Sequence, residues 1–86
     1  MRVAVLVSGG GTNLQALLDA KKAGGLKNAE FVCVISNRKG AYALERAKAH
    51  GIEAVYLPTT RYKEREDFQI ALRDALLTRK IDLIVL

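Results

Sequence analysis

Residues 2–14 read RVAVLVSGGGTNL, an apolar, β-branched run followed by three glycines and then by a helical pattern. An apolar run without polar alternation is typical of a strand buried on both faces, as in a parallel sheet. The helix is indicated by the capping-box spacing of Thr12 and Gln15, which opens a leucine stripe. A buried strand that passes through glycines into a helix is the opening unit of a doubly wound α/β sheet.

The rest of the chain repeats this alternation of strand and helix. Short apolar runs and amphipathic stripes predict four strands and three helices in all. We expect strands over 2–7, 30–36, 54–57 and 81–86, and helices from Thr12 to the Gly24–Gly25 pair, over about 41–50 and over about 63–79. Right-handed crossovers favour the strand order 3-2-1-4. The sequence therefore predicts a Rossmann-like, doubly wound parallel sheet with helices on both faces.

The fourth predicted strand, residues 81–86, reads IDLIVL and closes the chain. In the order 3-2-1-4 it lies beside the first strand, with its other edge bare. Natural proteins avoid long, apolar, unprotected edges. We therefore interpret residues 1–86 as the N-terminal half of a larger domain, incomplete at the C-terminus. Either the missing half or a second copy of the chain is expected to pair with this edge.

The composition of the 86 residues indicates one globular domain at most, with 50% hydrophobic and 27% charged residues. A single cysteine, Cys33, and a single histidine, His50, exclude disulfides and a thiolate–imidazole zinc site, so we expect no metal. No apolar run approaches the roughly 20 residues of a membrane span, and no signal peptide is recognisable. The net charge of +5 is scattered along the chain rather than clustered. We expect a cytoplasmic protein that binds neither membrane nor nucleic acid.

The glycine turn between the first strand and the first helix is a candidate anion site. Glycines let a ligand approach the backbone, and the free N–H groups of Gly11, Thr12 and Asn13 would face it at the positive end of the helix dipole. The Gly-Lys-Ser/Thr ending of a Walker loop is absent, and Leu14 replaces the third glycine of a dinucleotide fingerprint. NADP remains possible through Arg38 after the second strand, and a phosphomonoester on a small substrate fits at least as well.

Further polar candidates follow the second and third strands, whose loops open on the same edge of the sheet. Asn37 can touch a ligand or cap its own turn. Arg65, near the start of the third predicted helix, can bind a carboxylate or phosphate, or pair with the acids beside it. Cys33 is interpreted as a small core residue, and His50 as a cation at a helix C-terminus. No general base, nucleophile or metal cluster is convincing, so no catalytic residue is assigned.

Four stretches of the chain resemble the phosphoribosylglycinamide formyltransferases, the folate-dependent enzymes of purine synthesis. They are residues 3–17 with the motif SGGGTNLQ, residues 34–38 (VISNR), residues 43–47 (ALERA) and residues 82–86 (DLIVL). The resemblance covers the whole chain and keeps the spacing of the family. Its first motif distinguishes the family from ordinary dinucleotide-binding folds.

The resemblance implies transfer of a formyl group from 10-formyltetrahydrofolate to the amine of glycinamide ribonucleotide. It implies that Gly11, Thr12 and Asn13 hold the substrate phosphate and that Arg65 faces the folate. The catalytic residues of the family lie beyond the fourth strand, so the 86 residues are expected to be inactive alone. The alternative from a different class is an NADP-binding module of a reductase, which rests on Arg38 and the imperfect glycine pattern.

Overall fold

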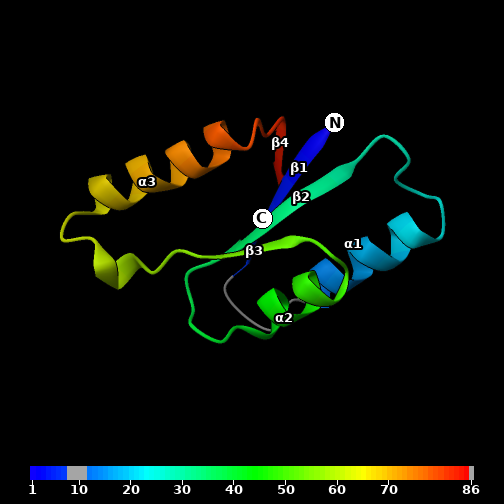
Figure 1. The fold of residues 1–86 in the computed structure, drawn as a ribbon, viewed down its shortest axis with the longest axis horizontal. Coiled ribbons are helices and arrows are strands. Elements are labelled where there is room, and N and C mark those ends of the chain that lie inside the picture. The colour runs from blue at the N-terminus through cyan, green and yellow to red at the C-terminus, as the bar shows by residue number, and fades with distance from the viewer. Residues whose placement is uncertain (8–11, 86) are drawn as a thin grey trace.

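The computed structural model describes residues 1–7 and 12–85, and of Thr12 and Asn13 it describes the backbone only. Four parallel strands form one sheet in the order β3-β2-β1-β4, as Figure 1 shows. The strands are β1 (Arg2–Val7), β2 (Glu30–Ser36), β3 (Glu53–Tyr56) and β4 (Leu83–Val85). The helices are α1 (Thr12–Lys22), α2 (Tyr42–Ala49) and α3 (Arg65–Thr78), with a short 3-10 turn, η1 (Thr59–Arg61), before α3. The predicted architecture and strand order are confirmed.

Three element bounds differ from the prediction. β3 lies one residue earlier than expected, although the Leu57 N–H still donates to the Ser36 carbonyl at 2.8 Å. α3 begins at Arg65 because the segment after Pro58 first forms η1, which no sequence signal indicated. β4 begins at Leu83 because Ile81 belongs to the turn that ends α3, and Asp82 joins that turn to the sheet through a hydrogen bond from its N–H to the Arg2 carbonyl at 2.8 Å.

The sheet carries helices on both faces, α1 and α2 on one and α3 on the other (Figure 1). The layer toward α1 and α2 is centred on Val3, Val5, Leu14, Leu18, Val34, Ala43, Leu44 and Ala47. The layer toward α3 is centred on Ala4, Cys33, Ile35 and Leu57. The register between β1 and β2 shifts at Val32, so Phe31 and Val34 both face the α1–α2 layer. The same layer contains Leu14 and Leu44, which lie near the starts of α1 and α2 at the carboxyl edge.

Polar contacts tie the amino ends of the strands to the end of α3. Arg79 donates to both carboxylate oxygens of Glu53 at 2.9 and 2.7 Å, and its carbonyl accepts from the Arg2 guanidinium at 2.9 Å. Asp82 in turn accepts from the Arg2 N–H at 2.8 Å. The hydrogen bond from Arg79 holds the pKa of Glu53 below its ordinary value. These contacts all lie at the amino edge of the sheet, and none of them involves the carboxyl edge.

The helices α2 and α3 end in the same Schellman turn with different residues at the left-handed position. After α2 this residue is Gly51, with φ of 71°, and Ile52 N–H donates to Ala47 at 2.9 Å. After α3 it is Lys80, with φ of 54°, and Ile81 N–H donates to Leu76 at 3.1 Å. A side chain in this conformation costs about 1 kcal/mol, which glycine avoids.

We therefore expect Lys80→Gly to stabilise the protein. The free energy of unfolding, measured by urea titration, should rise by about 0.5–1 kcal/mol, the strain of Lys80 less the greater chain entropy of glycine. Lys48→Gly, the same change at an exposed position inside α2, should lower it by a similar amount. A loss of stability in Lys80→Gly would contradict the strain argument.

Candidate functional site

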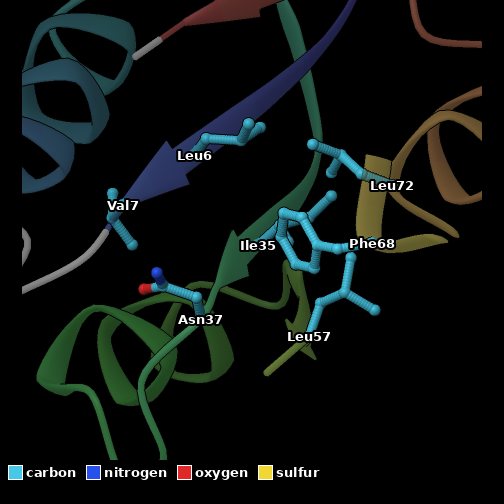
Figure 2. A pocket seen from close by; sticks show the side chains of 7 residues that line it. All are labelled: Leu6, Val7, Ile35, Asn37, Leu57, Phe68 and Leu72. Atoms are coloured by element: carbon cyan, nitrogen blue, oxygen red, sulfur yellow. The ribbon is translucent and has the colours of Figure 1, made fainter. Parts of the chain in front are cut away.

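The carboxyl ends of the strands hold a pocket of about 370 Å³ on the α3 face of the sheet (Figure 2). It is lined by Leu6, Val7, Ile35, Asn37, Leu57, Phe68 and Leu72. This is the edge at which open α/β sheets bind their ligands. Its volume lies within the range of small-molecule sites.

The walls of the pocket are apolar because three strand ends meet the inner stripe of α3. Phe68 and Leu72 stand one turn apart on α3 and face the strand residues, as Figure 2 shows. Tyr62 packs against Phe68 edge-on, with ring centroids 5.9 Å apart, and supports that wall. Among the lining residues that the structure describes, Asn37 is the one polar residue. The pocket therefore suits an apolar or aromatic group held by an amide at one side.

The predicted anion-binding turn lies partly outside the described residues. Gly11 is among the residues that the structure does not describe. Thr12 and Asn13 are the first two residues of α1, so their backbone stands at the helix N-terminus on the carboxyl edge. This position agrees with the sequence prediction, while the binding of an anion there stays a prediction.

The basic candidates are exposed around the same edge. Arg65 is the first residue of α3, and Arg61 ends η1. Arg38 follows β2, and its backbone N–H donates to the buried Ser36 hydroxyl at 3.1 Å. The structure brings Arg65 and the pocket to one edge of the sheet but does not place Arg65 among the pocket's lining residues. A charged group at the rim suits the acidic end of a ligand whose apolar part enters the pocket.

Cys33 and His50 lie where the sequence interpretation put them. Cys33 is fully buried under α3, and burial raises the pKa of its thiol, which suits a core residue. His50 caps the C-terminus of α2, and its Nδ1 lies 2.9 Å from the Arg46 carbonyl. It lines a second cavity of about 490 Å³ at the amino ends of the strands, opposite the candidate site. The one histidine of the chain is therefore remote from the carboxyl edge.

Two properties of the described part of the chain bear on its chemistry. Over residues 1–7 and 12–85, no group of three or more His, Cys, Asp or Glu side chains could hold a metal ion. In the same part of the chain, no helix is both long and apolar enough to cross a bilayer.

A polar link between α1 and α2 escaped the sequence analysis. Arg46 of α2 donates to Gln15 of α1 at 2.7 Å, although 31 residues separate them along the chain. The spacing of Tyr42 and Arg46, one helical turn apart, was the one available signal, and their ring and guanidinium are stacked at 4.6 Å. Nothing in the sequence pattern indicated that Gln15 would be the partner.

The fold and the pocket at the strand ends together define a doubly wound α/β protein with an apolar pocket at the carboxyl edge of its sheet. The chain belongs to the formyl transferase family, whose model matches residues 1–86. It is 40% identical over 85 residues to phosphoribosylglycinamide formyltransferase of Haemophilus influenzae, and 41% identical over 86 residues to the trifunctional purine biosynthetic protein adenosine-3 of Chironomus tentans. These alignments cover 99% of this chain in both cases, and 40% and 6% of the respective relatives.

Solved structures agree with this assignment. Glycinamide ribonucleotide transformylase 1 from Symbiobacterium toebii superposes with a TM-score of 0.91 at 40% identity, over 98% of this chain and 39% of its own. The chain thus spans about two-fifths of the length of its single-function relatives. The expected family and fold are confirmed. Neither the family match nor these relatives support the alternative of an NADP-binding reductase module.

Proposed function

We propose that residues 1–86 are the substrate-phosphate-binding half of an enzyme that transfers a formyl group from 10-formyltetrahydrofolate to glycinamide ribonucleotide. The carrying observation is the family match over the whole chain. It is joined by the position of α1, which begins at Thr12 on the carboxyl edge of the sheet, directly after three glycines in the sequence. The relatives that match are named for this formyl transfer or for purine biosynthesis. The one cysteine of the sequence, Cys33, has no partner for a disulfide, which favours action in the cytoplasm.

The phosphate of glycinamide ribonucleotide binds to the backbone N–H groups of Gly11, Thr12 and Asn13. Support comes from the position of Thr12 and Asn13 as the first residues of α1. The first N–H groups of a helix have no partner within the helix, and the helix dipole adds positive potential there. A phosphomonoester accepts hydrogen bonds from these N–H groups, and its negative charge is stabilised by the positive potential. Binding through the phosphate leaves the amine of the substrate free to approach the formyl donor.

The formyl donor lies on the α3 side of the same edge. Its ring system suits the apolar walls of the pocket, where Phe68, Leu72 and Leu57 are half-buried or buried. Arg65, exposed on the first turn of α3, is the cation available for the acidic tail of a folate. In this arrangement the folate and the nucleotide approach each other across the ends of β1 and β4.

Removal of the Arg65 side chain should weaken binding of the folate and leave binding of the nucleotide unaffected. In the full-length enzyme, Arg65→Ala is expected to raise KM for 10-formyltetrahydrofolate about 10-fold, the lower end of what loss of one charged hydrogen bond costs, and to leave KM for the nucleotide unchanged. Arg61→Ala removes a neighbouring exposed cation and is the matched control. If Arg65→Ala raised only the KM for the nucleotide, Arg65 would have to be assigned to the substrate phosphate instead of the folate.

The bare edge of β4 is the proposed contact with the rest of the enzyme. Among the described residues, β4 pairs with β1 alone, and Leu83 and Ile84 are 46% and 45% exposed. The matched relatives are more than twice as long as this chain. A further strand from the remaining part of the protein would cover this edge, and a second copy of the chain is the competing occupant.

Isothermal titration separates the proposed function from its alternative. Glycinamide ribonucleotide and NADPH are each injected into the full-length protein under the same conditions. We expect heat of binding from glycinamide ribonucleotide and none from NADPH. Saturable binding of NADPH without binding of the nucleotide substrate would overturn the proposal in favour of a reductase module.

A further inference from the structure

Arg46 makes a direct polar link between the two helices that share one face of the sheet. Its guanidinium, in the second turn of α2, donates to the Gln15 side-chain oxygen at 2.7 Å. Gln15 lies in the first turn of α1 and donates in turn to Asp19 at 2.9 Å. The link to Gln15 is part-buried and its donor is charged, which makes it stronger than a neutral surface contact. The three side chains thus form a chain of hydrogen bonds from α2 into α1.

Arg46 is itself held in place on α2. Its guanidinium lies over the Tyr42 ring, 4.6 Å from the centroid, and Tyr42 is 60% exposed. An aromatic side chain that remains this exposed contributes little to the core. It does restrict the rotamers of Arg46, so less conformational entropy is lost when Arg46 binds Gln15.

The position of this link coincides with the candidate phosphate turn. Both helices follow parallel strands and run back along the sheet, so their first turns stand at the carboxyl edge (Figure 1). Gln15 is the fourth residue of α1, two positions after Asn13 and in the same first turn. Arg46 therefore fixes α1 at the turn whose free N–H groups would meet an anion.

We propose that Arg46 is a positioning residue for the substrate phosphate, which acts through Gln15. This inference rests on the proposed function. Backbone N–H groups bind a phosphate only when the whole turn is correctly placed, and a displacement of about 1 Å reduces such binding strongly. Without the link, the start of α1 keeps its apolar packing through Leu14 but loses the hydrogen bond that joins Gln15 to α2.

The test compares KM values in the full-length enzyme. We expect Arg46→Met and Gln15→Met each to raise KM for glycinamide ribonucleotide about 10-fold, while kcat and KM for the folate change less than about twofold. The Ki of inorganic phosphate against the nucleotide should rise in parallel. The double variant should be no worse than the more impaired single variant, because both changes break one link.

Two further variants separate positioning from general charge or stability. Arg46→Lys can still donate to Gln15 and should recover part of the lost affinity. Lys48→Met removes an equal charge from α2, where Lys48 is exposed 3.8 Å from Glu45, and should leave KM unchanged. Thermal unfolding of each variant identifies any that is not folded.

The inference is wrong if Arg46→Met leaves KM for the nucleotide unchanged, or if the double variant shows the product of the two single effects. It is also wrong if Lys48→Met raises KM as much as Arg46→Met. If the unaltered enzyme shows no formyl transfer to glycinamide ribonucleotide, the proposed function fails instead, so the two failures are distinguishable.

Discussion

The 86-residue chain by itself is expected to show no formyl transfer to glycinamide ribonucleotide. Attack of the substrate amine on the formyl carbon requires a group that moves a proton within hydrogen-bond reach. Over the described residues, the carboxyl edge offers Asn37, the start of α1 and exposed arginines, none of which is a general base at neutral pH. The first turn of α3 adds the carboxylates of Glu66 and Asp67, but neither lines the pocket. His50, the one histidine of the chain, lines the cavity at the opposite edge.

The assay compares the purified chain with and without the remaining part of the protein supplied as a second polypeptide. Activity should appear only in the mixture, because a strand added beside β4 would bring the missing groups to the ends of the sheet. Turnover by the chain alone would show that a catalytic group is present and was overlooked.

Size-exclusion chromatography of the chain alone tests the exposed edge. Leu83 and Ile84 should drive association, which the second polypeptide should suppress. A monodisperse monomer at high concentration would show that the edge is protected.

The architecture could be predicted because its signals are local in sequence. The unbroken apolar run of β1 indicated a strand buried between two layers, and the structure places Val3 and Ala4 in opposite layers. The helix expected over about 41–50 ends where Gly51 and Ile52 form a Schellman turn, whose two hydrogen bonds are present. The right-handed crossover between consecutive parallel strands then left few strand orders to consider. Element ends were less accurate where a residue without a sequence signal changed the backbone, as Lys80 does after α3.

The site could be predicted only in outline, because its parts come from distant segments. The rule that loops meet at the carboxyl edge placed Asn37, Arg65 and the start of α1 at one edge, as the structure does, while the glycines before α1 lie outside the described residues. The apolar pocket needs Phe68 and Leu57 to face one another across the end of the sheet, which depends on how α3 packs. The partner of Arg46 depends on the packing of α1 against α2. Periodicity states which face of a helix is buried, but not which residues meet there.

The substitution Gly11→Val is expected to impair the enzyme through substrate binding rather than chemistry. A β-branched residue restricts the backbone of the turn and places methyl groups where the phosphate approaches the N–H groups. Loss of one or two charged hydrogen bonds corresponds to a rise of about 30- to 100-fold in KM for glycinamide ribonucleotide. KM for 10-formyltetrahydrofolate should stay nearly constant, because the proposed folate contacts come from α3 and the pocket.

A matched control for Gly11→Val is Ala16→Val, which adds the same side chain to an exposed position of α1. It costs some helix propensity and should leave both KM values unchanged. Together the two variants distinguish blockage of the turn from general weakening of the helix. Since a phosphate bound at the first turn of α1 must sense a side chain at Gly11, an unchanged KM in Gly11→Val would rule out this turn as the phosphate site. The substrate would then have to be held by the exposed cations of the same edge, Arg38 and Arg65 among them.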